Sequence, residues 1–298
     1  AASDVYKRQD VSIADFRAEN PGQITAPLFD NTVDVLRGVT SFTVANNFKH
    51  SDGALSFFYN WGYHEINDGY KTGEKPLNYR YHSRDYNYGI LFYQIVRMWK
   101  GNMLTLGFDY KSYGGKAWNH FLTETPDKVM VDTSAYDLGG YAILQQNLFK
   151  DVLTLNAGVR LEHNEAFGNK WIPQLGLALR PTENFVIKSS FSKGFRNPTI
   201  REMFMWAPAN PDLKPEEVTN YEVVLEHAFF KKKMNIEVSG FIADGDNLIQ
   251  TQIIDGNPKN VNTGSFKNKG VEVAFRAALC SKLDIGGNYS WLYMKIPV

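Results

Sequence analysis

Polar and apolar side chains alternate along most of this sequence, and that period restricts the fold more than any other feature. From Leu153 to Leu161 every second residue is apolar, while the residues between them are Thr, Asn, Gly and Arg. Because successive side chains of a β-strand point to opposite faces, this pattern predicts strands with one apolar and one polar face. The period recurs in residues 104–110, 234–239, 271–279 and 283–293, and no comparable helical period is present. The sequence therefore predicts an all-β, antiparallel fold.

The connections between the predicted strands alternate in length. We predict about twelve strands, at residues 34–47, 52–64, 84–98, 102–113, 134–147, 151–163, 171–180, 184–193, 218–230, 233–254, 259–279 and 282–294. Short turns are expected at 48–51, 99–101, 148–150, 181–183, 231–232 and 280–281, and longer loops at 65–83, 114–133, 164–170 and 194–217. Strict alternation places all short turns at one rim, as in membrane barrels with periplasmic turns and extracellular loops.

The tenth and eleventh predicted strands are unusually long. Asp244-Gly245-Asp246 interrupts the tenth, and we expect a β-bulge there because a turn would reverse every later strand. Each strand has about twenty residues, roughly twice the number that crosses a bilayer. The surplus is expected to project outside as a hairpin closed by the turn sequence Asp255-Gly256-Asn257-Pro258.

Composition excludes several classes of protein. The 32 basic and 32 acidic residues balance, so there is no electrostatic case for nucleic acid as a partner. A transmembrane helix needs about 18 consecutive apolar residues, which the sequence lacks. The single cysteine, Cys280, permits no internal disulfide and is expected to be a small apolar side chain.

Alternation alone leaves a soluble β-sandwich open, because its strands also carry one apolar face. Aromatic residues that gather near predicted strand ends favour lipid, since such residues form girdles at both membrane interfaces. They are Phe57, Tyr59, Trp61, Tyr86, Tyr88, Trp99, Tyr289, Trp291 and Tyr293. We therefore prefer a transmembrane barrel to the sandwich.

Two boxes and a downstream signature resemble those of a known family. Phe-Arg-Asn-Pro at 195–198 ends a predicted strand, and Asn-Pro-Asp-Leu at 210–213 closes the following loop. Residues 247–250, 261–264 and 268–272 follow in order. Together they resemble the Phe-Arg-X-Pro box, the Asn-Pro-X-Leu box and the long-hairpin signature of TonB-dependent outer-membrane receptors. The residues that match the motifs are Phe195, Arg196, Pro198, Asn210, Pro211, Leu213, Gly270 and Glu272.

The resemblance implies a partial barrel, with about 12 of the family's 22 strands in residues 34–298. Residues 10–33 are expected to be an extramembrane loop. Residues 1–9 show neither a strand period nor a signal peptide and are interpreted as junction sequence. The family's plug domain and TonB-pairing segment are not recognisable. Because such a partial barrel has two unpaired strand edges, we predict that this chain alone cannot transport.

The family's activity supplies the expected function. A member of this kind lies in the outer membrane of a Gram-negative bacterium, surrounded by outer-membrane lipid. Its extracellular loops capture a scarce nutrient, most often a ferric siderophore or a similar chelate, and the TonB complex acts through the plug to release it inward. No catalytic residue, resident cofactor or metal is expected. The rivals are a passive porin, a soluble carbohydrate-binding β-sandwich and an outer-membrane enzyme, although no G-x-S-x-G nucleophile motif is present.

Two predicted loops carry candidate ligand contacts. Cationic and aromatic side chains can bind an anionic or aromatic ligand by charge-assisted hydrogen bonds and stacking. The candidates are Arg196, Arg201, Phe204 and Trp206 in one loop, and Tyr113, Trp118 and His120 in the other. Packing of Phe204 and Trp206 against neighbouring loops is the alternative. In haem-receiving members of the family a histidine lies between the two boxes. None lies here between Pro198 and Asn210, so the resemblance disfavours haem as a ligand. His64-Glu65 lacks the second histidine of a zinc motif.

Overall fold

The computed structural model describes residues 4–205, 207–280 and 282–295. Within them lies one short helix, α1 (Ile200–Phe204), and the other regular elements are strands. The strands are β1 (Asp4–Glu19), β2 (Gly22–Gln23), β3 (Ala26–Phe48), β4 (Ser51–Lys71), β5 (Tyr79–Val96), β6 (Asn102–Phe121), β7 (Lys128–Leu148), β8 (Leu153–Asn164), β9 (Gly168–Thr182), β10 (Phe185–Arg196), β11 (Glu216–Phe229), β12 (Met234–Asp246), β13 (Ile249–Ile254), β14 (Asn257–Asn262), β15 (Ser265–Cys280) and β16 (Leu283–Lys295).

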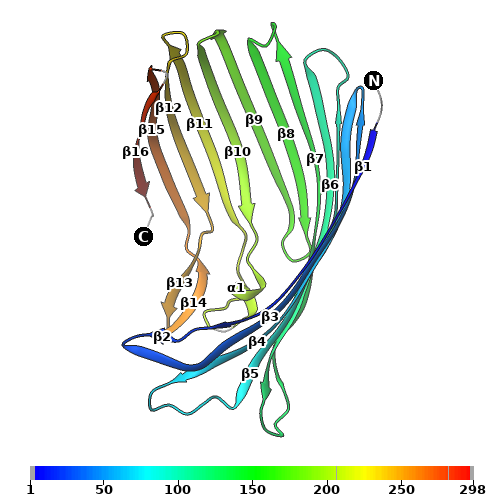
Figure 1. The fold of residues 1–298 in the computed structure, drawn as a ribbon, viewed down its shortest axis with the longest axis vertical. Coiled ribbons are helices and arrows are strands. Elements are labelled where there is room, and N and C mark those ends of the chain that lie inside the picture. Colours follow the sequence, from blue (N-terminus) through cyan, green and yellow to red (C-terminus); the bar gives the residue numbers. More distant parts are fainter. Residues whose placement is uncertain (1–3, 206, 281, 296–298) are drawn as a thin grey trace.

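A single curved sheet forms the wall of the molecule (Figure 1). It has 14 strands in the order β1-β3-β4-β5-β6-β7-β8-β9-β10-β11-β12-β15-β16, with β2 paired to β3. Neighbouring strands are antiparallel, as predicted. In the described residues β1 and β16 each have one neighbour, so the sheet is an open part of a barrel. Short turns lie at one end, and α1 with the β13–β14 hairpin lies at the other.

All twelve predicted strands have a counterpart, but several extend far into the predicted long loops. β4 continues to Lys71 and β6 to Phe121, so the loops that remain are 72–78 and 122–127. β5 and β6 stay paired as far as Tyr79 and Phe121. Backbone hydrogen bonds continue there although the apolar alternation has stopped. The sequence pattern therefore marks the part of each strand that faces lipid rather than the whole strand.

The N-terminal region differs from the expectation. Residues 4–19, expected to be partly junction and partly loop, form β1, which pairs with β3 from Asp4 opposite Asn47 to Glu19 opposite Thr32. The expected loop over 10–33 is thus limited to the surroundings of β2. Arg17 binds Asp34 of β3 across this pairing, at 2.6 Å between Nε and Oδ1. The charged side chains of β1 hide the strand period. The origin of residues 1–9 stays a prediction, and residues 1–3 lie outside the described part.

The bulge expected at residues 244–246 is absent from the structure. β12 keeps one register with β15 through Asp246, which lies opposite Ser265. The strand ends at Asp246, and the next residue, Asn247, has a φ of 58°, which asparagine tolerates. The predicted tenth strand is therefore β12 plus β13, and the eleventh is β14 plus β15. The projecting hairpin is confirmed: Asp255 and Gly256 close β13–β14 with φ of 51° and 79°.

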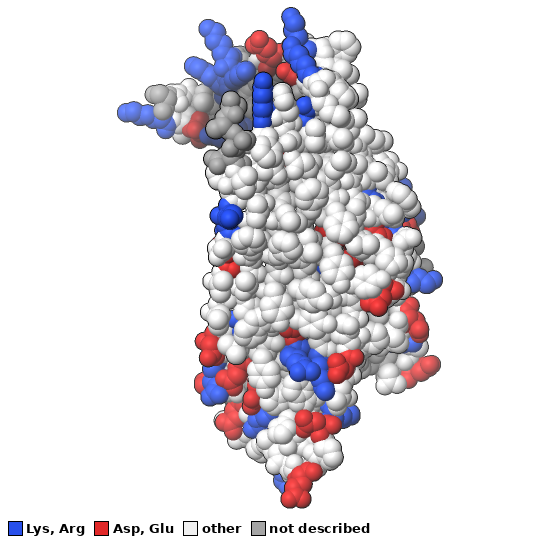
Figure 2. Space-filling model, turned by 90° about the vertical axis from the view of Figure 1, so that its right-hand side faces the viewer, with Lys and Arg blue, Asp and Glu red and all other residues white. Residues whose placement is uncertain are grey.

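The two faces of the sheet differ as the alternation predicts. On β6, Leu106 and Phe108 are 44% and 43% exposed and share one face. Asp109 lies on the other face, which we call the inner face because α1 folds back across it to contact β7. Viewed from the side, an uncharged band separates charged side chains at the two ends (Figure 2). No helix in the described residues is long and apolar enough to span a membrane.

Glycines let ion pairs cross a strand on the inner face. Arg160 on β8 reaches over β7 to Asp109 on β6, with Nη1 at 2.6 Å from Oδ2. Gly139 of β7 lies beneath this pair, and a Cβ there would overlap the guanidinium. β3, β4 and β5 repeat the arrangement with Gly62 in the middle. These pairs give the inner face charges that are already partnered.

Candidate ligand-binding site

A cavity of about 510 Å³ lies on the inner face, at the end of the sheet that carries the long loops. Its wall comes from β6, β7 and β8, and the segment that follows β10 covers it. The lining residues are Lys111, Tyr113, Asp137, Glu162, Phe195, Asn197, Pro198, Thr199, Ile200 and Arg201. Three residues of the Phe-Arg-X-Pro box, Phe195, Asn197 and Pro198, therefore line the cavity.

The wall of this cavity is a connected polar network. Asn164 is 2% exposed and donates to Asp137 Oδ1 at 2.6 Å and to the Tyr113 hydroxyl at 3.2 Å. Lys111 Nζ lies 3.1 Å from Asp137 Oδ2. The Asn164 side-chain oxygen accepts from the backbone of Ala166 at 2.8 Å. Since these groups are satisfied, the wall is rigid before any ligand binds.

The cover of the cavity is held by a capping box. Thr199 is the N-cap of α1, and its hydroxyl accepts from the Glu202 backbone N–H at 3.2 Å. The Glu202 carboxylate in turn accepts from the Thr199 backbone N–H at 2.8 Å. This reciprocal pair satisfies N–H groups that a helix start leaves unbonded, and it allows a helix of one turn to form.

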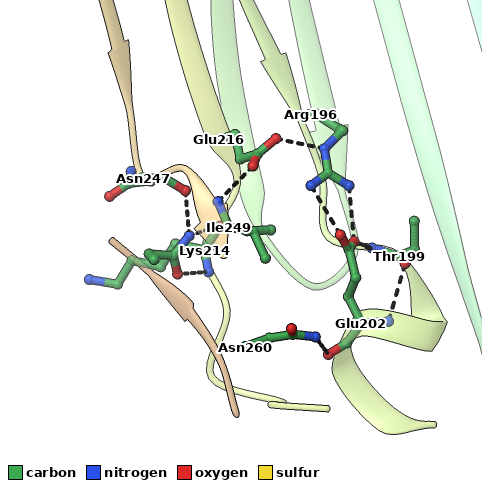
Figure 3. A network of polar contacts seen from close by, with 9 residues as sticks. Arg196, Thr199, Glu202, Lys214, Glu216, Asn247, Ile249 and Asn260 are labelled. Carbon is green, nitrogen blue, oxygen red and sulfur yellow. Dashed lines mark hydrogen bonds and ion pairs between the residues drawn. The ribbon is translucent and has the colours of Figure 1, made fainter. Parts of the chain in front are cut away.

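Arg196 joins the cover to the sheet (Figure 3). Its guanidinium donates to Glu216 Oε2 at 2.6 Å and to both oxygens of Glu202 at 2.9 and 3.1 Å. Hydrogen bonds to Glu216 and then Glu202 raise the pKa of Arg196. Burial alone would raise the pKa of Glu202, but the bonds from Arg196 and Thr199 outweigh it and lower that pKa. Arg196 is therefore occupied by this chain's own carboxylates.

The second box is attached to the β13–β14 hairpin. Asn210 is 6% exposed and donates to the Asn260 carbonyl at 2.8 Å, while Leu213 is 3% exposed. Asn260 donates its backbone N–H to the Pro208 carbonyl at 2.6 Å and its side-chain amide to the Glu202 carbonyl at 3.2 Å. One residue of β14 thus binds Glu202, Pro208 and Asn210.

A second asparagine completes the attachment. Asn262 Oδ1 accepts from the Lys214 backbone N–H at 2.8 Å, and its amide donates to the Lys214 and Asn247 carbonyls at 3.0 and 2.6 Å. Glu216 also accepts from the Ile249 backbone N–H at 2.7 Å. The motif residues of the boxes and of the hairpin signature, far apart in sequence, therefore meet in one network.

The structure brings some of the predicted ligand contacts together. Tyr113 and Arg201 line the cavity from opposite sides, one on the wall and one on the cover. Arg196 is held by two carboxylates, and Phe204 is 41% exposed on α1. Trp206 lies outside the described residues. The role of each of these side chains in binding stays a prediction.

Trp118 and His120 lie elsewhere. Both follow Tyr113 on β6 by an odd number of residues, which places them on the outer face. There the Trp118 ring stacks on His82 with centroids 5.4 Å apart, and His120 Nδ1 lies 2.9 Å from Asp127 Oδ1. They are not part of the inner cavity.

The two remaining motif residues have packing roles on β15. A Cβ on Gly270 would lie 2.6 Å from the Phe241 ring and 2.6 Å from the Trp291 carbonyl. Glu272 accepts from the Ser290 hydroxyl at 3.4 Å across to β16. Neither residue lines the inner cavity.

Sequence reasoning missed most of the residues that build the wall and the anchors: Lys111, Asp137, Glu162, Asn164, Glu202, Glu216 and Asn260. It placed Asn262 in the long-hairpin signature but gave it no anchoring role. One signal was available, because Thr199-x-x-Glu202 is a capping-box sequence that marks a helix start. The others lie on β6, β7, β8, β11 and β14, and only the tertiary structure brings them together. Among the described residues, no group of three or more His, Cys, Asp or Glu side chains is placed to hold a metal ion.

Comparison with known proteins decides the family. Residues 3–297 match the family model described as TonB dependent receptor-like, beta-barrel. The chain belongs to the TonB-dependent receptor family. This is a family of outer-membrane receptors and transporters of Gram-negative bacteria, not of enzymes.

The relatives found by sequence share less than a third of their residues with this chain over the aligned parts, and they are much longer than it. The receptor chain is 24% identical over 187 residues to the vitamin B12 transporter BtuB of Vibrio vulnificus, and this covers 59% of the chain and 28% of that protein. It is 30% identical over 91 residues to BtuB of Photobacterium profundum, covering 30% of the chain and 15% of the relative. The chain therefore matches less than a third of the length of these relatives.

Solved structures share the fold. The siderophore receptor PirA of Pseudomonas aeruginosa superposes with a TM-score of 0.68 at 16% identity, covering 97% of this chain and 55% of that one. The alcaligin outer-membrane receptor FauA of Bordetella pertussis gives a TM-score of 0.70 at 16% identity, covering 98% of this chain and 50% of FauA. At such identities the likeness concerns the fold alone.

Proposed function

We propose that this receptor chain is part of the barrel of a transporter that captures a ferric siderophore outside the cell and releases it inward with energy from TonB. The inner cavity carries this proposal. Its 510 Å³ lies within the range of about 300–1,000 Å³ that is usual for small-molecule sites. It also lies at the loop end of the sheet, which is the extracellular end in outer-membrane barrels.

The chemistry of the cavity suits a chelate with anionic oxygens and aromatic groups. Lys111 and Arg201 supply cations, and the Tyr113 ring lines the wall. The side-chain oxygen of Asn197 is buried and has no hydrogen-bond partner among the described residues, so it can accept a bond from a polar ligand. Asp137 and Glu162 balance the cations, which favours a ligand with donors as well as acceptors.

Cobalamin is the second candidate ligand. The sequence relatives described above are vitamin B12 transporters, whereas the structural relatives are siderophore receptors. Both ligands would use the same cavity and the same TonB-dependent release. A passive porin is the rival function, and it would need neither the ligand-binding cavity nor TonB-dependent release.

Growth rescue separates these functions. A strain that lacks the gene is supplied with a panel of ferric siderophores under iron limitation, or with cobalamin when cobalamin is required. We expect the gene to restore growth on one siderophore, and the rescue to disappear when the tonB gene is also deleted. Rescue on cobalamin alone would transfer the assignment to the second candidate, and rescue without TonB would favour the porin.

Two matched variants test whether the growth rescue depends on ligand binding in the inner cavity. Arg201→Gln removes a cation from the cover of the cavity, and we expect it to raise the ligand concentration for half-maximal growth about tenfold. Arg180→Gln is the control, because Arg180 donates to the Thr154 hydroxyl near the short turns at the opposite end. Equal effects of both substitutions would place the ligand outside this cavity.

A further inference from the structure

A second cavity lies on the outer face, on the side of the sheet that faces lipid. Its volume is about 540 Å³, and it spans β4, β5, β6 and β7. The residues that line it are Tyr59, Trp61, Gly62, Tyr63, Arg84, Asp85, Tyr86, Gly115, Lys116, Asp132, Thr133 and Ser134. None of the proposed ligand contacts of the inner cavity belongs to this set.

This outer cavity lies at the extracellular border of the apolar band. On β5 the outward residues between Arg84 and Gln94 are Tyr86, Tyr88, Ile90 and Phe92, all uncharged. About ten tilted residues cross a bilayer, so Arg84 lies where acyl chains end and headgroups begin. On β6, Lys116 is the first charge beyond a similar run that starts at Leu104. The side view shows the charged groups gathered beyond the uncharged band (Figure 2).

Two cations lie side by side in the lining of the cavity. Arg84 of β5 and Lys116 of β6 are partners in the strand register. Side chains in such positions lie close together, and like charges placed opposite each other destabilise a sheet. Lys116 has one carboxylate, Asp132, with Nζ at 3.6 Å from Oδ2. The side chain of Arg84 is exposed and makes no hydrogen bond or ion pair within the described ranges. An anion between the two cations would remove the repulsion.

The other walls are aromatic. Tyr59 and Tyr63 are 46% and 37% exposed, and Trp61 lies between them on the same face. Tyr86 stacks with Tyr88 at 5.9 Å between ring centroids. Aromatic rings with polar tips are suited to the headgroup level of a membrane, and their faces can pack against the C–H faces of a sugar ring.

We propose that the outer cavity binds the phosphorylated sugar headgroup of a glycolipid in the outer leaflet. The phosphate lies between Arg84 and Lys116, where each cation gives a charge-assisted hydrogen bond. The sugar ring packs on the wall of Tyr59, Trp61 and Tyr63, and the acyl chains run along the apolar band below. This lipid site is separate from the inner cavity, from which it is divided by the sheet.

Thermal unfolding in detergent tests the proposal on the receptor purified from its own gene. The probes are bisphosphorylated lipid A, the same glycolipid without phosphate, and phosphatidylglycerol. We expect lipid A to raise the Tm and the other two to have little effect. Arg84→Gln should weaken lipid A binding about tenfold, because it removes one charge-assisted bond. Arg180→Gln, at the opposite end of the sheet, should leave it unchanged.

The sign of the variant effect distinguishes binding from structural support. Without lipid, Arg84→Gln should leave the Tm equal or slightly higher, since it removes a like-charge contact. With lipid A, the same variant should melt below the native protein. A lower Tm in both conditions would show that Arg84 only supports the sheet and would overturn the proposal. Equal stabilisation by phosphatidylglycerol or by the dephosphorylated glycolipid would overturn the assignment to a phosphorylated sugar.

Discussion

Glycine and large side chains are matched across the strands of this sheet, residue by residue. Gly107 lies opposite Tyr141 and Gly38 opposite Trp61, and in each case a Cβ would overlap the ring. Gly139 serves an ion pair in the same way, as it gives space to the Arg160 guanidinium. A glycine normally weakens a strand, so each one here is compensated by the group that lies over it.

Substitution at Gly139 should therefore break an ion pair. Gly139→Ala forces the Arg160 guanidinium away from Asp109, and we expect a loss of about 1–2 kcal/mol in the free energy of unfolding. Denaturant unfolding in lipid vesicles would measure it. In an Asp109→Asn background the same substitution should cost much less, because there is no strong pair left to break.

Gly140→Ala is the matched control at the next position. Its Cβ would have no neighbour closer than the Gly107 carbonyl at 4.0 Å. We expect this substitution to be neutral or to stabilise by about 0.4–1 kcal/mol, because alanine restricts the unfolded chain. Similar losses at both positions would show that strand backbone, not the ion pair, requires glycine at 139.

At the scale of elements, the β13–β14 hairpin acts as the support for the cover of the inner cavity. Asn260 connects it to Glu202 of α1 and to Asn210 of the second box, and Asn262 connects it to Lys214, which follows that box. Arg196 connects the cover to the sheet. The cover is therefore fastened on two sides, and its position depends on residues that do not contact the cavity.

Loss of Asn260 should release the cover. Asn260→Ala removes the side-chain bond to the Glu202 carbonyl and the bond from Thr251, although its backbone contacts to Pro208 and Asn210 persist. We expect amide exchange in residues 199–210 to become roughly tenfold faster, with little change in the strands. Asn257→Ala at the tip of the hairpin is the control. Unchanged exchange in the Asn260 variant would contradict the supporting role.

Order in the cover should also depend on pH. The folded pKa of Glu202 is below its ordinary value of 4.5, so its ionised contacts stabilise the cover fully above about pH 4.5. This contribution is lost as the pH falls through the lowered folded value, because a protonated carboxyl no longer pairs with Arg196. Proteolysis of the 197–215 segment should therefore increase below pH 4.5. In Glu202→Gln the cover should already be loose at neutral pH, and a pH dependence as large as that of the native protein would contradict the role of Glu202.

At the scale of the whole molecule, the two faces of the sheet meet different surroundings. The outer face carries the apolar band between two charged ends, and the inner face carries partnered charges such as Arg160 with Asp109. An open sheet of this kind also leaves β1 and β16 with unpaired edges in the described residues. Such edges are costly in lipid, because their backbone groups lack hydrogen-bond partners there.

A charge on each face tests this orientation. Phe108→Arg places a cation near the middle of the outer band, and we expect a loss of about 2–4 kcal/mol in folding into lipid bilayers. Thr105→Arg, on the inner face of the same strand, should cost far less. Unfolding titrations in vesicles give both values. Equal losses would mean that the inner face is not open to water.

Much of the fold was predictable from the sequence, because lipid on one side imposes an alternation that is visible in residues such as Leu153 to Leu161. The ends of the strands could not be predicted from the sequence. Beyond the membrane the strands are held by backbone hydrogen bonds, which any side chain permits. β1 was missed because its charged side chains hide the strand period. Of the candidate site, the motif boxes located the cover and Tyr113 located one point of the wall. The placement of Trp118 and His120 on the opposite face depends on register.

The sequence by itself determined the antiparallel wall, its two faces and the end that carries the loops, because burial in lipid acts on each residue locally. Tertiary structure alone decided that the Arg196 guanidinium is hydrogen-bonded to Glu202 and Glu216, and that Arg84 lies beside Lys116. Those contacts join residues on different strands, and their existence depends on a strand register that no local pattern records.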